Sequence, residues 1–317
     1  MKLHLDKNTF KQFINKINSE TNIDVDIIEK DYYVCLVLNE LSKKQNEIKA
    51  YFKGGTAIYK ILDTMNRFSE DIDLTVKVLK EQSNTQNKNR LKQSALGYEI
   101  EGLKLSKKEC VDKKGSVTAI YKYNSIFEIE EVPLQRAGKI QIEATSFTVS
   151  EPTENNIIEP IIYKLASENE KKILKDNYEV KPIEIEVIKL ERMFIDKIFA
   201  AEFYYIREMY TDMAKHIYDI CILLENAKIQ TLLKNEKELS QLIDYKRKEE
   251  KVRLGGINEK LLLKDFSYLK CDFNKQFIDK FNSMQNKYIT DDKYKIDLDI
   301  VENKLSNIKE LFIKYDF

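Results

Sequence analysis

The feature that most constrains the fold lies between Phe52 and Val76, in the stretch FKGGTAIYKILDTMNRFSEDIDLTV. Two adjacent glycines, Gly54 and Gly55, follow a short apolar run, and two aspartates separated by one residue lie in a second apolar run. The residues between the two runs have helical spacing. This order predicts a strand, a tight turn, a helix that begins near Thr56 and a second strand.

Asp71 and Asp73 are the two aspartates of the second predicted strand. Alternate residues of a strand point to the same face, so these carboxylates project together while Ile72 and Leu74 face the core. Two carboxylates held close together repel each other unless a cation lies between them. Because Mg²⁺ prefers carboxylate and phosphate oxygens, the pair predicts a site for Mg²⁺ or the related ion Mn²⁺.

The glycine turn predicts a phosphate-binding site. Gly54 and Gly55 let the backbone approach a ligand closely, and the N–H groups at the start of the next helix can bind phosphate. Thr56 either caps that helix or bonds a phosphate oxygen. Turn and aspartates together fit an NTP held through its phosphates and its metal. The matching reaction is nucleotidyl transfer, in which an acceptor hydroxyl attacks the α-phosphate and pyrophosphate leaves.

A third carboxylate is expected on a neighbouring strand, where it would complete the metal site. Glu143 in KIQIEAT is the best candidate, because it lies on the polar face of an otherwise apolar strand. Glu128 and Glu130 in IFEIEEVP are weaker competitors.

The composition limits the class of protein. The chain has 317 residues with 53 basic and 53 acidic side chains, so it can form two subdomains and lacks a general positive charge. No apolar run approaches the roughly 18 residues of a membrane span, and the N-terminus lacks the apolar core of a signal peptide. Four scattered cysteines predict reduced thiols and a cytoplasmic protein. Two histidines argue against a zinc site or a Ser-His-Asp triad.

The patterns along the chain predict an α/β (α+β) fold. Residues 7–45 have helical spacing, VTAIYKYNSIF and KIQIEATSFTV alternate like strands, and a helix is expected after the polar stretch SNTQNKNR. From about Leu190 the chain is mainly helical. We therefore expect N-terminal helices over 1–45, a core with a short mixed sheet over 46–160, and a mainly helical C-terminal domain over 161–317 that completes the active-site cleft.

The motif KGGT…RFSEDIDL resembles the signature of the DNA polymerase β-like nucleotidyltransferases, and more narrowly the AbiEii/AbiGii toxin family of bacterial abortive-infection and toxin–antitoxin systems. Three further segments resemble motifs of that family: IEKDYYV at residues 28–34, RMFIDKIFA at 192–200 and KHIYDI at 215–220. The glycine and aspartate motif is shared by the wide superfamily, whereas the four segments in this order are typical of the toxin branch.

The resemblance implies roles at the matched positions. Asp71 and Asp73 would bind Mg²⁺, and the third-carboxylate match at Glu143 is the weakest of the set. The triphosphate would be held by Gly54, Gly55 and Thr56, with help from Ser69, and by Lys197. Asp219 would lie in the active site and place or deprotonate the acceptor.

Several of these side chains also have ordinary structural interpretations. Lys197 could extend its ammonium to solvent from a helix that is otherwise apolar, and Asp219 could form an ion pair with Lys197 or Lys215. Arg67 could contact substrate or brace the turn against Glu70. Residues 29–31 (Glu-Lys-Asp) could be an exposed charged face or could line the cleft.

A tyrosine cluster bears on the acceptor. Tyr204, Tyr205 and Tyr210, beside Arg207, could stack on the bases of single-stranded RNA or could simply pack between helices. By resemblance, the acceptor is RNA, in particular the 3′ end of tRNA, and a cognate antitoxin is expected. The alternatives are protein nucleotidylation (AMPylation), a nucleotide-binding regulator without turnover, and a structural partner in a phage-defence complex.

Overall fold

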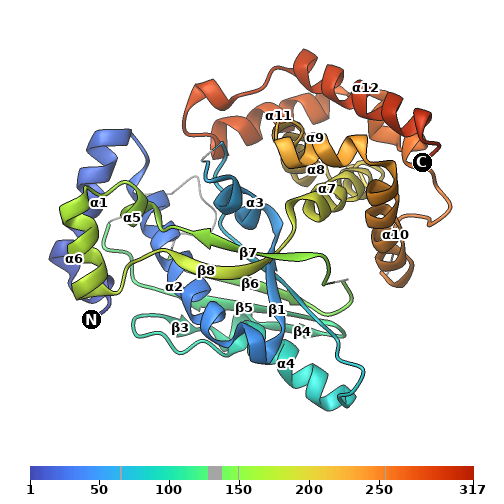
Figure 1. The fold of residues 1–317 in the computed structure, drawn as a ribbon. Helices are drawn as coiled ribbons and strands as arrows, with labels where there is room; N and C mark the ends of the chain where they lie inside the picture. Colours follow the sequence, from blue (N-terminus) through green and yellow to red (C-terminus); the bar gives the residue numbers. More distant parts are fainter. Residues whose placement is uncertain (65, 128–137, 149, 254) are drawn as a thin grey trace. The chain divides into compact units, whose positions relative to one another are not determined.

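The chain forms two compact units, Met1–Val187 and Ile188–Phe317, in a computed structural model that describes all residues except 65, 128–137, 149 and 254 (Figure 1). The first unit contains a sheet with helices, and the second is helical among its described residues. The mixed α/β class expected from the sequence is confirmed. The helix α7 starts at Leu190, where the pattern predicted mainly helical structure, but residues 161–187, expected in the C-terminal domain, lie in the first unit.

The sheet of the first unit mixes parallel and antiparallel pairs. Its strand order is β3-β5-β6-β2-β1-β8-β7, and β4 pairs with β5 (Figure 1). β1 is antiparallel to β2 and parallel to β8, and β2 is parallel to β6. The strand bounds are β1 Ala50–Lys53, β2 Ile72–Val76, β3 Lys104–Leu105, β4 Val111–Lys113, β5 Ser116–Lys122, β6 Lys139–Thr145, β7 Thr153–Ile158 and β8 Ile183–Ile188.

The helices of the first unit cover an apolar face of this sheet. α2 and α4 pack against each other and against the strands, where Ile140, Ile142 and Ala144 of β6 are fully buried as the alternation predicted. The bounds are η1 Leu3–Leu5, α1 Lys7–Thr21, α2 Val25–Ile48, α3 Gly54–Leu62, α4 Asn84–Leu96, η2 Lys107–Glu109, α5 Ile161–Lys164 and α6 Glu168–Tyr178.

Three local predictions need correction. The helix α3 begins at Gly54, so Thr56 lies inside its first turn and is not the residue that opens it. The helix expected after the polar stretch SNTQNKNR begins within it, as α4, because Ser83 and Gln86 form a capping box there. The strands β7 and β8 were not predicted, although IEIEVI of β8 alternates in burial as a strand should.

The second unit is built around α7 and α8, which pack against each other, with α11 against α8. Phe194, Ile198 and Ala201 of α7 are fully buried, so this helix has the apolar face that the sequence predicted. The bounds are α7 Leu190–Tyr205, α8 Tyr210–Leu223, α9 Ala227–Lys234, α10 Glu236–Val252, η3 Leu263–Asp265, η4 Ser267–Lys270, α11 Lys275–Tyr288, η5 Asp292–Tyr294 and α12 Leu298–Lys314. Among the described residues, no helix is both long and apolar enough to cross a membrane.

Candidate active site

The glycine turn and the aspartate strand meet at Gly54. This residue has φ +84°, a conformation that L side chains rarely adopt, and a Cβ built on it would lie 2.0 Å from Oδ2 of Asp73. The carboxylate of Asp73 therefore lies directly against the Gly54 backbone at the start of α3. The sequence spacing predicted that these two elements belong to one site, and within the first unit the structure brings them together.

Gly55 makes a second close approach in the same turn. A Cβ on Gly55 would lie 2.8 Å from Oγ of Ser69 and 2.9 Å from Nη2 of Arg67. The Thr56 hydroxyl donates a hydrogen bond of 3.1 Å to the Ser69 hydroxyl. Ser69 and Thr56 are thus joined at the N-terminus of α3, where backbone N–H groups and the helix dipole favour a phosphate group. Arg67 also lies here, with its guanidinium carbon 5.2 Å from the centre of the Tyr59 ring.

The three candidate carboxylates share one face of the sheet. Asp73 on β2 is directly paired with Glu143 on the parallel strand β6, and paired residues of neighbouring strands point to the same side. Asp71 immediately precedes β2 and is two residues from Asp73, so it belongs to that face as well. Glu143 is exposed. The weaker candidates Glu128 and Glu130 lie outside the described residues.

These carboxylates suit a metal that a substrate helps to hold. In the described part of the chain, no three His, Cys, Asp or Glu side chains gather closely enough to bind a metal by themselves. Mg²⁺ is commonly held by one or two carboxylates together with substrate phosphates, so a full protein cage is not required. Lys53 is paired with Asp73 from the other side, on β1. Lys53 was not among the predicted site residues, although this lysine directly precedes the two glycines.

A buried lysine from α2 links the two strands that carry the carboxylates. Lys30 is 2% exposed, its Nζ lies 3.3 Å from Oε2 of Glu70, and it donates to the carbonyl oxygen of Lys139. Glu70 immediately precedes Asp71, and Lys139 is the first residue of β6, which carries Glu143. Lys30 therefore braces the start of both strands from within the core and does not form part of an exposed charged face.

The neighbours of Lys30 are also buried and paired. Asp31 accepts a hydrogen bond of 2.7 Å from the backbone N–H of Ile161 and forms an ion pair with Lys60 of α3. Glu29 accepts hydrogen bonds from Ser125 and Ile126. Burial raises the pKa of Glu29, and these two hydrogen bonds oppose that rise. The buried charges of the segment at 28–34 thus hold the strands β2 and β6 and the helix α3, which carry the candidate site residues.

Replacing Lys30 by methionine should lower the rate of nucleotidyl transfer by about 10- to 100-fold, the usual effect of losing a supporting contact behind a metal site. The substitution removes the link between Glu70 and β6. Steady-state kinetics should show the loss mainly in kcat, and Lys30→Arg should restore part of it. Lys43→Met, at an exposed position of the same helix, is the matched control. Equal losses in both variants would contradict the bracing role.

Lys197 and Asp219 form a buried ion pair within the second unit. Nζ of Lys197 lies 2.7 Å from Oδ2 of Asp219, and the two side chains are 9% and 0% exposed. Of the two lysines that the sequence offered as partners for Asp219, Lys197 is the one shown in this pair. Asp219, being fully enclosed, can hold the Lys197 ammonium but does not present its own carboxylate to solvent.

Replacing Asp219 by asparagine should lower the free energy of unfolding by about 3 kcal/mol, because it leaves the Lys197 charge buried without its carboxylate. Urea denaturation measures this change. The double variant Lys197→Met/Asp219→Leu should recover most of the loss, since both charges of the pair are then removed together. Asp316→Asn, which removes one partner of an exposed pair with Lys264, should cost less than about 1 kcal/mol. A loss in Asp219→Asn no larger than in this control would contradict the prediction.

Two tyrosines of the cluster contact other side chains of the second unit. The Tyr204 ring stacks on His216 with centroids 5.2 Å apart and planes 12° apart. Tyr210 is buried, and its hydroxyl accepts a hydrogen bond of 2.9 Å from Asn274. Tyr210 therefore packs inside the second unit, and one face of the half-buried Tyr204 ring is covered by His216, which favours packing between helices for these two rings.

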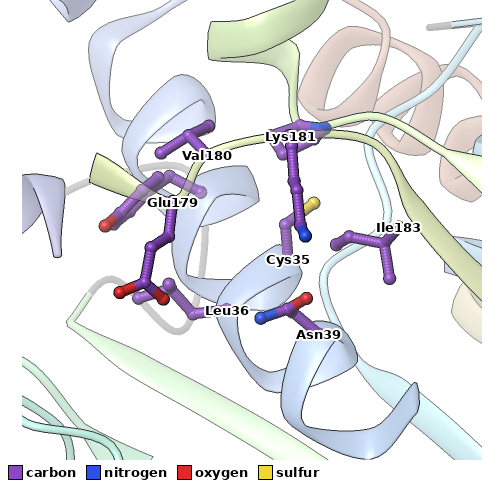
Figure 2. A pocket seen from close by; sticks show the side chains of 9 residues that line it. Cys35, Leu36, Asn39, Glu179, Val180, Lys181 and Ile183 are labelled. Carbon is purple, nitrogen blue, oxygen red and sulfur yellow. The ribbon is translucent and has the colours of Figure 1, made fainter. Parts of the chain in front are cut away.

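A small pocket in the first unit is lined by none of the candidate phosphate-binding or metal-binding residues. It lies between α2 and the segment around Glu179 to Ile183, with Cys35 among its lining side chains (Figure 2). Burial raises the pKa of the Cys35 thiol to about 12, so this thiol stays protonated and is a poor nucleophile. The pocket gives no support for cysteine-based catalysis.

Comparison with known proteins identifies a family and a similar solved structure. The sequence model of the family described as "Nucleotidyl transferase AbiEii toxin, Type IV TA system" matches residues 36–299. A solved structure, the nucleotidyltransferase toxin MenT4 from Mycobacterium tuberculosis H37Rv, is similar with 14% identity and a TM-score of 0.42, over 90% of this chain and 94% of MenT4. No curated protein matches the sequence. Because the family match covers most of its length, the chain belongs to the AbiEii family of nucleotidyltransferase toxins of type IV toxin–antitoxin systems.

Proposed function

We propose that the protein transfers a nucleoside monophosphate from an NTP to the 3′ end of an RNA, with tRNA as the acceptor. The observation that carries this proposal is the contact between Asp73 and Gly54. It places a carboxylate suited to binding a divalent cation against a turn whose N–H groups suit a triphosphate. Modification of tRNA would block translation and stop growth, which suits a toxin that acts in phage defence and is controlled by a cognate antitoxin.

Each residue of the site has a defined task in this reaction. Asp71 and Asp73, with Glu143 as the third candidate, would hold Mg²⁺, which would neutralise phosphate charge and activate the acceptor hydroxyl. The N–H groups of Gly54, Gly55 and Thr56 would bind phosphate oxygens, and the Ser69 hydroxyl would fix the Thr56 side chain beside them.

The second unit contributes two further candidates. We assign Lys197 as a phosphate contact and Asp219 as the residue that keeps its ammonium in place. In the transfer step, the acceptor oxygen bonds to the α-phosphorus, the bond from that phosphorus to the bridging oxygen breaks, and pyrophosphate leaves with the bridging oxygen. The hydroxyl proton passes to solvent. The protein supplies position and charge throughout.

A transfer assay tests the proposal. Purified protein and Mg²⁺ are incubated with each α-³²P-labelled NTP and with total RNA or total protein, and the products are separated on denaturing gels. Label in a tRNA-sized band that is absent with Asp71→Ala supports RNA transfer and identifies the nucleotide. Label in protein bands instead would replace RNA transfer with AMPylation. Nucleotide binding without any labelled product would favour a regulator without turnover.

A further inference from the structure

Two arginines enclose an aromatic ring at the ends of α7 and α10. The guanidinium carbons of Arg207 and Arg253 lie 3.7 and 3.8 Å from the centre of the Phe203 ring. Two planar groups this close to one ring centre must lie on its opposite faces. The ring holds both guanidinium planes in place by cation–π stacking and leaves N–H groups at their edges free to meet an anion.

The position of Arg207 is fixed by the turn that closes α7. Glu208 has φ +55°, and the N–H of Met209 donates a hydrogen bond of 3.0 Å to the carbonyl oxygen of Tyr204. The Arg207 side chain donates to the carbonyl oxygens of Phe203, at 2.8 Å, and Gly255. Among the described residues, Arg207 has only these carbonyl acceptors and pairs with no carboxylate. Within the described part of the chain, this exposed cation is not neutralised by a carboxylate.

The positive charge of Arg253 is only partly compensated by a carboxylate. Its Nη1 lies 3.5 Å from Oε1 of Glu250, and the same oxygen lies 3.1 Å from Nζ of Lys246. Lys248 and Lys251 at the end of α10 are exposed and add positive charge, although Lys251 lies 3.3 Å from Glu259. The surface around Phe203 therefore carries positive charge held on a rigid, aromatic support.

We propose that the stack formed by Arg207, Phe203 and Arg253 binds the backbone of single-stranded acceptor RNA; this inference rests on the proposed function. Guanidinium groups match phosphate oxygens in a two-point hydrogen bond, and their outer faces can stack on unpaired bases. Surfaces that hold single strands combine positive charge with planar groups on which bases stack. An acidic protein segment would use the charge but not the planar faces, so RNA is the better match.

RNA binding by the double variant Arg207→Ala/Arg253→Ala tests this inference. Fluorescence anisotropy with a short labelled single-stranded RNA should show an affinity about tenfold or more below that of the unmodified protein. The slope of log affinity against log salt should become shallower by about 1.4, because two phosphate contacts worth about 0.7 each are lost. The matched control is Lys234→Ala/Lys237→Ala, which removes two exposed cations where α9 ends and α10 begins and should change the affinity less than twofold.

Two further measurements keep the test decisive. The affinity for an NTP and the thermal unfolding of the double variant should match those of the unmodified protein. Arg207→Lys, which keeps the positive charge but not the planar guanidinium group, should lose part of the RNA affinity.

The inference is overturned if both arginines can be removed without loss of RNA affinity, or if only binding of an acidic peptide is lost. If RNA binds through the stack but no NTP labels it, the inference stands and the proposed transfer fails. If RNA is labelled with the same KM by the double variant, the inference fails and the proposed transfer stands.

Discussion

Asp73→Asn should reduce nucleotidyl transfer by at least about 10³-fold, equivalent to about 4 kcal/mol of transition-state stabilisation, while the chain remains folded. Asparagine has the same size and shape as aspartate, but it lacks the negative charge that a divalent cation requires. Asp73 is only partly buried at the edge of the Gly54 turn, so this change leaves the core intact. Initial rates of labelling at saturating Mg²⁺ and NTP measure the loss, and circular dichroism checks the fold.

Asp112→Asn is the matched control for this prediction. It makes the same chemical change at an exposed position of β4 in the same sheet, where Asp112 pairs with Lys92. Its transfer rate should stay within about twofold of the unmodified protein, as expected for an exposed ion pair. A fully active Asp73→Asn would rule out the metal site at β2. Glu143→Gln, measured in parallel, shows whether the exposed carboxylate on β6 also contributes, since loss of a third metal ligand should lower the rate as well.

Local signals were enough to predict the centre of the first unit. The glycines, the helical spacing after them and the alternation around Asp71 and Asp73 each act over a few residues, so the strand, turn, helix and strand were predictable without partners. The alternation of β6 likewise predicted the face that Glu143 occupies. The contact between Gly54 and Asp73 follows from this arrangement, because the antiparallel pairing of β1 with β2 places Lys53 opposite Asp73.

The supporting charges behind the site were not predictable, because their partners are distant in sequence. The pattern left residues 29–31 either on an exposed face or in a cleft. In the structure they are buried because each finds a partner from another element, such as Glu70 for Lys30 and the Ile161 N–H for Asp31. Buried charges are tolerated only when they are paired in this way. No spacing rule within α2 can show partners that lie 40 to 130 positions away.

The second unit shows the same limit for aromatic residues. The sequence offered Tyr204, Tyr205 and Tyr210 as one cluster, but a helix distributes consecutive residues around its axis. Tyr204 turns to His216 and Tyr210 to the core, whereas Phe203 meets Arg253 from α10, some 50 positions away. The sequence showed that aromatic residues lie beside the basic residue Arg207. Only the packing of two helix ends showed which of them form a stack.

Gly54→Ala should abolish detectable transfer, with a loss comparable to that of Asp73→Asn, although it removes no functional group. Its methyl group would lie 2.0 Å from Oδ2 of Asp73 and 2.8 Å from Cγ, so the carboxylate must move away from the start of α3. The backbone at φ +84° also disfavours alanine, which should cost about 1–2 kcal/mol of folding stability. Transfer rates and urea denaturation separate the two effects.

Gly115→Ala separates backbone strain from the displacement of Asp73. Gly115 has φ +77° in the turn between β4 and β5, but a Cβ there would lie 3.4 Å from Phe147, which is tight but can be relieved by a small movement. Both variants should therefore lose similar stability, whereas only Gly54→Ala should lose transfer. If Gly54→Ala keeps its activity, the close approach of carboxylate and glycine is not required for catalysis. If both variants lose activity equally, the loss comes from a weakened sheet. Activity lost at Gly54 alone would show that catalysis depends on the position of the Asp73 carboxylate at the helix N-terminus.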